Sequence, residues 1–183
     1  MISARHPVAS GDRKKTVVRR SRSGGAQSSP VVRRTLAEYA QRGVFRAYGD
    51  RHAEGGRSRF SFKWHTDVPL TVTYDPARRA LVFRDLLPAV PSRSDMYREL
   101  KEFVRVRTSR ALPEHRRVDP RKVTTAFRNR AGVVSLVVSL KDAHLEYGVR
   151  KAVNLIHEVF VQFLREPAYF DYMVEHFDLN PEL

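Results

Sequence analysis

The sequence predicts an α+β fold in which an antiparallel sheet of about five to six strands packs against two to three helices. Two observations favour this class. Apolar and polar residues alternate strictly over 60–65 and again over 70–74, as half-buried strands require. From Val149 the apolar residues instead recur at the 3.6-residue period of a helix. With 183 residues and 42% hydrophobic content, the chain is long enough to bury one core.

The composition divides the chain into three segments. Residues 1–30 contain few large apolar side chains and many Ser, Gly and Arg, so we expect a disordered basic tail. Residues 31–165 hold the alternating and helical patterns and form the expected α+β domain. Residues 166–183 mix aromatic with acidic residues and predict a C-terminal helical segment.

The first half of the domain reads as one helix followed by a meander. Apolar residues at helical spacing predict a helix from Pro30 to about Tyr48, and the glycines of 49–58 predict a loop. Strands follow at 60–65, 70–74 and 81–83, and the turn residues of 75–79 separate the second strand from the third.

The second half begins with a helix. Ser92 and Asp95 have the spacing of a capping box, and Met96, Leu100 and Phe103 form one helical stripe behind it. A basic loop follows this helix. The remaining elements are expected as strands at 123–127 and 133–140, a short strand at 143–147, a helix from Val149, and a last helix from Pro167.

This order of helix, three strands, helix, two or three strands and helix resembles the bacterial type III secretion chaperone-like fold. The resemblance covers roughly residues 31–165 and rests on element order alone. It implies helices packed on a sheet, a tendency to dimerise and a non-enzymatic role in binding other polypeptides. Secretion chaperones are typically acidic, whereas this chain carries a formal net charge of +14.

The basic residues gather in two places that suit phosphate groups. Candidate nucleic-acid-binding residues in the tail and in the middle of the chain are Arg13, Lys14, Lys15, Arg19, Arg20, Arg105, Arg107, Arg116, Arg117, Arg121 and Lys122. The alternative is a solvated basic surface with no specific ligand. After Asp142 the balance reverses, because acidic residues outnumber basic ones.

Several chemistries find no support. The chain has no cysteine, which excludes disulfides, thiolate metal sites and cysteine nucleophiles. His157 and Glu158 resemble the start of a zinc-protease helix, but Val161 stands where the second histidine is needed. No nucleophile elbow or phosphate-binding glycine loop is present. We therefore expect no catalytic residues, no metal and no cofactor.

The aromatic row of Phe60, Phe62 and Trp64 has two interpretations. It could be a base-stacking platform like that of an RNA-binding sheet, or the core-facing row of a strand. The strict alternation with polar residues favours the core.

Two functions therefore stay open. The first is a cytoplasmic, non-enzymatic protein-interaction module with a chaperone-like or adaptor role, which binds an unidentified protein and could form a homodimer. The second is a nucleic-acid-binding protein that contacts RNA or DNA phosphates, in a ribonucleoprotein particle for example. No apolar stretch is long enough to span a membrane, so no membrane partner is expected.

Overall fold

The computed structural model describes residues 24–52 and 56–178, and for 24–29, His52 and Asp142 it describes the backbone only. It confirms the α+β class, with a six-stranded antiparallel sheet in the order β1-β2-β3-β4-β6-β5. The strands are β1 (Arg46–His52), β2 (Ser58–Lys63), β3 (Leu70–Asp75), β4 (Ala80–Leu87), β5 (Val123–Arg130) and β6 (Val133–Leu140).

The described residues contain four α-helices, which correspond to the four helices predicted along the chain. They are α1 (Gly24–Gln41), α2 (Asp95–Val106), α3 (Leu145–Glu158) and α4 (Phe170–Phe177). Helix α3 continues into a π-helical turn at Val159–Phe163, and a short 3₁₀ turn at Pro167–Tyr169 leads into α4. None of the helices in this part of the chain is both long enough and apolar enough to cross a bilayer.

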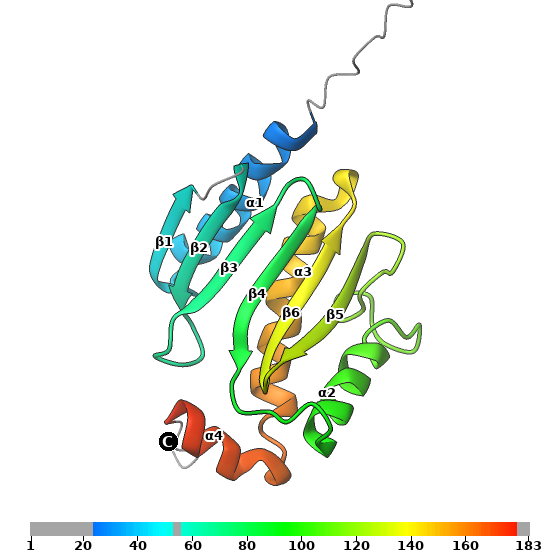
Figure 1. Ribbon diagram of the computed structural model, residues 1–183. Helices are drawn as coiled ribbons and strands as arrows, with labels where there is room; N and C mark the ends of the chain where they lie inside the picture. Colours follow the sequence, from blue (N-terminus) through cyan, green and yellow to red (C-terminus); the bar gives the residue numbers. More distant parts are fainter. Residues whose placement is uncertain (1–23, 53–55, 179–183) are drawn as a thin grey trace, which may run out of the picture.

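Helices α1 and α3 lie side by side on one face of the sheet, behind the strands in Figure 1. Helix α2 lies beside β5, and α4 lies beyond the end of the sheet. The hydroxyl of Tyr97 on α2 donates to the carbonyl of Phe127 in β5 over 3.3 Å. The hydroxyl of Tyr172 on α4 donates to the carbonyl of Pro88, just past β4, over 2.6 Å.

The core fills the space between the sheet and the pair α1 and α3. Phe60 and Phe62 are fully or almost fully buried, and the ring of Phe62 stacks on Phe45 with centroids 3.9 Å apart. From the helices, Leu36 and Ile156 are fully buried. The aromatic row of β2 therefore belongs to the core, as the alternation indicated.

Ser94 caps α2, because its hydroxyl accepts a hydrogen bond from the backbone N–H of Tyr97 at 3.2 Å. The sequence placed the cap at Ser92, two residues too early. The helix is amphipathic as expected, with Leu100 and Val104 buried and its Arg and Lys residues on the outer side.

Three element assignments from the sequence are wrong. The helix expected over residues 30–48 ends at Gln41, and 46–52, expected as helix end and loop, forms strand β1. The strand expected over 143–147 is instead a 3₁₀ turn and the start of α3. The sixth strand of the sheet is therefore β1, early in the domain, and not the strand predicted over 143–147.

The predicted disordered tail covers residues 1–30, of which 1–23 lie outside the described residues. Helix α1 begins at Gly24, six residues before the expected start, and Pro30 lies inside it.

Candidate functional site

The expected basic cluster is only partly a cluster, because most of its arginines are already engaged by carboxylates. Arg107 is 6% exposed and its guanidinium forms a hydrogen-bonded ion pair with Glu158, which is also buried. Arg116 reaches the same carboxylate from the loop after α2, with Nε 3.2 Å from Oε1. Both arginines also donate to the amide oxygen of Gln162, over 3.0 and 2.8 Å. This network ties the loop to the end of α3.

Arg105 and Arg121 have local partners. Arg105 forms a bidentate ion pair with Glu102, three residues earlier on α2. Arg121 pairs with Asp119, whose carboxylate also accepts the backbone N–H of Arg121 at 2.9 Å. The side-chain hydrogen bond from Arg121, and then the backbone one, lower the pKa of the Asp119 carboxyl. Exposed pairs of this kind are weak, so they reduce rather than abolish phosphate affinity.

Arg117 and Lys122 are half-buried. The backbone carbonyl of Arg117 accepts from the hydroxyl of Tyr147 over 3.4 Å, and the ammonium of Lys122 lies 4.8 Å from the centroid of the same ring. Lys151 anchors the same loop, because its buried ammonium donates to the carbonyls of Glu114 and His115 over 3.1 and 2.6 Å. Burial lowers the pKa of Lys151.

The tail candidates Arg13, Lys14, Lys15, Arg19 and Arg20 lie outside the described residues. The structure therefore brings Arg107, Arg116, Arg117, Arg121 and Lys122 together in and around the loop between α2 and β5. Arg107 and Arg116 hold the loop on α3 through Glu158, whereas the exposed Arg121 pairs with Asp119 within the loop, so the residues do not form one free cationic patch.

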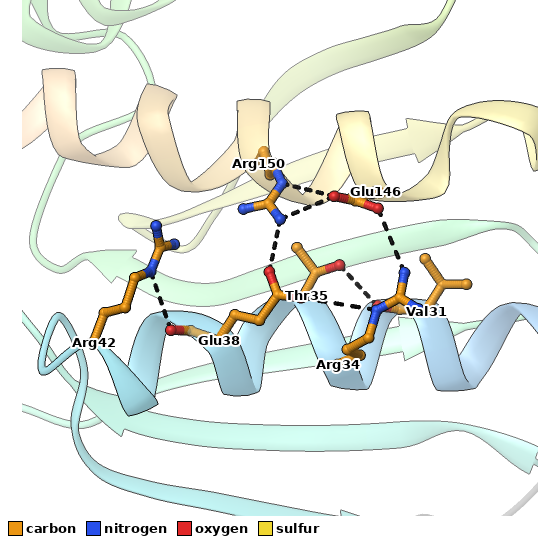
Figure 2. A network of polar contacts seen from close by, with 7 residues as sticks. All are labelled: Val31, Arg34, Thr35, Glu38, Arg42, Glu146 and Arg150. Atoms are coloured by element: carbon orange, nitrogen blue, oxygen red, sulfur yellow. Dashed lines mark hydrogen bonds and ion pairs between the residues drawn. The ribbon is translucent and has the colours of Figure 1, made fainter.

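A second ion-pair network joins the two helices behind the sheet. Figure 2 shows Arg150 of α3 between Glu146 of its own helix and Glu38 of α1, with N–O distances of 2.9 and 2.6 Å. Arg34 of α1 approaches Glu146 at 3.5 Å and so closes the network. Hydrogen bonds to Glu146 and Glu38 raise the pKa of Arg150. Helices α1 and α3 are thus joined by ion pairs between residues of opposite charge.

The opposite face of the sheet has a different character. In the described part of the chain no helix crosses this face, which is turned towards the viewer in Figure 1. We call it the open face. By strand alternation and register it includes Arg51, Arg59, Ser61, Lys63, Thr71, Thr73, Asp75, Ala80, Val82, Arg84, Thr124, Ala126, Arg128, Arg130, Val133, Ser135, Val137 and Ser139.

One cross-strand row runs through the middle of the open face. Arg59 pairs with Thr73, Thr73 with Val82, Val82 with Val137 and Val137 with Ala126. All but Arg59 are small or medium side chains, so the middle of the face is low and flat. The hydroxyl oxygen of Thr73 is buried there and has no hydrogen-bond partner in the described part of the chain.

Five exposed arginines of the described residues stand on this face by register: Arg51 on β1, Arg59 on β2, Arg84 on β4, and Arg128 and Arg130 on β5. Three of them, Arg59, Arg84 and Arg128, lie in the cross-strand row or next to it. No carboxylate in the described residues forms an ion pair with them, in contrast to Arg105, Arg107, Arg116 and Arg121. The sequence pointed to none of the three, because each stands alone among strand residues.

Two histidines of the described residues lie close together, without further metal ligands. His157 on α3 and His65, just after β2, approach each other with Nδ1 and Nε2 3.2 Å apart. His65 also stacks on Phe160, with ring centroids 4.9 Å apart. Burial first, and then the nearby His157 and Arg165, lower the pKa of His65 to about 4. No group of three His, Asp or Glu residues suited to a metal ion occurs in the part of the chain that the structure describes.

Comparison of the chain with protein-family models, with curated proteins and with solved structures finds no significant match. The resemblance to the secretion-chaperone-like fold therefore remains a proposal based on element order.

Proposed function

We propose that this protein is a non-enzymatic protein-interaction module with an adaptor or chaperone-like role, and that the open face is its partner-binding surface. The observation that carries the proposal is the one-sided sheet. Its other face is covered by α1 and α3, whereas the open face presents the exposed Ala126 and the half-buried Val82 on either side of the buried Val137, among arginines that form no ion pair within the described residues. Sheets in small domains generally bury both faces or leave one polar, and this face is mixed.

Binding of nucleic acid is the second candidate, favoured by the net charge of +14 and by the exposed arginines of the open face. Two features support the protein partner over it. The aromatic row of β2 is buried in the core, so the strand residues that the structure describes on the open face offer no ring on which a base could stack. In addition, Arg107 and Arg116 are engaged by Glu158.

Site-specific photo-crosslinking in cells tests the proposed function. A photoreactive amino acid replaces Ala126 or Ser139 on the open face, and Gln41 at the exposed end of α1 serves as the control position. We expect one defined polypeptide to be crosslinked from both open-face positions and not from Gln41. Crosslinks to nucleic acid alone would favour the second candidate, and equal crosslinking from all three positions would remove the open face from the proposal.

A further inference from the structure

The arrangement of the arginines on the open face says what kind of partner it fits. Ser135 of β6 pairs with Arg128 of β5, and its hydroxyl accepts the backbone N–H of Asp85, the neighbour of Arg84, over 3.3 Å. Arg84 and Arg128 therefore stand on either side of β6. Because adjacent strands lie about 4.8 Å apart, the two backbones are separated by roughly 10 Å.

Between these two arginines lies a shallow track of small side chains. Ser135, Val137 and Ser139 of β6 form its floor, with Val82 on one side and Ala126 on the other. An α-helix with its side chains is about 10–12 Å wide, so one helix laid along β6 would fill the space between Arg84 and Arg128.

We propose that the open face binds an acidic amphipathic helix of a partner polypeptide. Its apolar stripe would cover Ala126 and the exposed part of Val82, above the buried Val137, and its flanking carboxylates would pair with Arg84 and Arg128. A further carboxylate on the β2 side would reach Arg59. Arginine suits this role because its planar guanidinium binds carboxylates through two parallel hydrogen bonds. This inference rests on the proposed function and adds the chemistry of the partner.

The positive charge of the open face favours an acidic partner over a second copy of the chain. A two-fold dimer formed through this face would bring two faces of the same positive charge together. Two carboxylates on the neighbouring strands form no ion pair with the arginines of the open face in the described residues. Asp75 at the end of β3 is bound to Arg57, with Nε 3.0 Å from Oδ2, and Asp85 forms no ion pair in the described residues.

Fluorescence anisotropy with a designed peptide tests the inference on the full chain at physiological salt. The probe is an 18-residue labelled peptide with Leu and Ala on one helical face and Glu on its flanks. Two control peptides accompany it: one carries Lys at every Glu position, and the other has the same composition in scrambled order. We expect the acidic amphipathic peptide to bind about tenfold or more tightly than either control.

Two triple variants with the same change in charge locate the binding. Arg59→Glu, Arg84→Glu and Arg128→Glu together should weaken binding of the acidic peptide about tenfold or more. Arg93→Glu, Arg110→Glu and Arg165→Glu, at exposed positions away from the open face, should change it less than about threefold. If the first triple variant fails to fold, Ala126→Glu alone takes its place, since it puts a carboxylate directly on the track.

Several outcomes would overturn the inference. Equal losses in the two triple variants would show attraction to the net charge alone, and equal binding of the scrambled peptide would exclude a helix. A single-stranded RNA that binds more tightly and loses its affinity in the open-face variant would assign the face to nucleic acid. A dimer that the open-face variant converts to a monomer would assign it to a second copy. If the crosslinking identifies a polypeptide partner at Ala126 but the acidic peptide does not bind, only the partner chemistry is wrong.

Discussion

Glu158 is a carboxylate for which the sequence indicates no partner, but which forms buried ion pairs in the fold. It is 9% exposed and holds Arg107 and Arg116, two residues of the basic segment some fifty positions earlier in the chain. Removal of one partner from a buried ion pair leaves the other charge without compensation, which costs far more than the net contribution of the pair.

We therefore expect Glu158→Gln to lower the free energy of unfolding by about 3 kcal/mol. The double variant Glu158→Leu with Arg107→Met should recover much of that loss, because the charge then left without its carboxylate is that of Arg116, whose side chain is 35% exposed. Chemical denaturation of the three proteins measures both effects. A loss in Glu158→Gln below about 0.5 kcal/mol would show that the network is solvated in solution.

His65 makes stability depend on pH. Its pKa is about 4 in the folded protein and about 6.5 in an unfolded chain, so the unfolded state binds the proton more readily between these values. The contribution of His65 is complete above pH 6.5 and is lost as the pH falls towards 4. Relative to His65→Phe, which keeps a ring on Phe160, the wild type should lose on the order of 2 kcal/mol between pH 7 and 4.5, a figure reduced for solvent screening of the half-buried ring. Urea unfolding at both pH values measures this difference, and parallel pH profiles would contradict it.

The sequence indicated that arginines would form a binding surface, but it did not show which of them are already paired with carboxylates in the fold. It pointed to Arg107 and Arg116 because they belong to a dense run, and density is visible along the chain. Their partner Glu158 lies on another element, and no local pattern links it to them. Strand register alone places Arg59, Arg84 and Arg128 on the same face of the sheet. This register is set by the folded sheet rather than by neighbours in sequence.

At the scale of elements, the contact between α3 and the sheet depends on Gly148. A Cβ atom added there would collide with the side chain of Leu140 and lie 2.9 Å from Cγ1 of Val123. The helix can approach β5 and β6 this closely only because the side chain is absent.

We expect Gly148→Ala to destabilise the domain by about 1–2 kcal/mol, although alanine is the better helix former. Leu140→Ala in the same chain should make room for the new methyl group, so the double variant should be more stable than the sum of the two single changes predicts. Thermal unfolding of the four proteins in the cycle tests this coupling. Simple additivity would mean that α3 shifts away from the sheet instead.

Long, regular patterns predicted their elements well, and short ones did not. The stripe from Val149 to Phe163 and the alternation of β2 and β3 correspond to observed elements, because each pattern persists over several residues. Strand β1 was not predicted, because Arg46–His52 contains only Ala47 and Tyr48 as apolar residues and its polar and apolar residues do not alternate. Its pairing with β2 also carries an irregularity between Arg46 and Gly49. Such an edge strand is defined by its neighbour more than by its own sequence.

For the molecule as a whole, the net charge of +14 predicts non-specific attraction to nucleic acid at low salt. Binding to duplex DNA should fall with log salt at a slope of about 0.9 per phosphate bound and largely disappear near physiological salt. Neutralisation of Arg105 and Arg121 to Gln should change the slope little, because both are paired with carboxylates. The same change at Arg59 and Arg84 should lower the slope by about 0.9 for each phosphate that the variant no longer binds.

Salt titrations followed by fluorescence anisotropy measure these slopes. Sub-micromolar binding that resists physiological salt would contradict the proposed function and promote the nucleic-acid alternative.

The strand order has a consequence for how the chain reaches its native state. Strands β1 to β4 join sequential neighbours through short connections, whereas β4 must find β6 across a segment that includes α2 and the loop after it. Asp85 and Ser135, which meet at this junction, are fifty residues apart. Closure of so long a loop costs entropy before its contacts repay it, so the meander should assemble first and the β4–β6 junction late. Phe62→Ala should then mainly slow folding, and Leu136→Ala should mainly speed unfolding, in stopped-flow measurements. The rate-limiting event would be the docking of a preformed meander onto the β5–β6 hairpin.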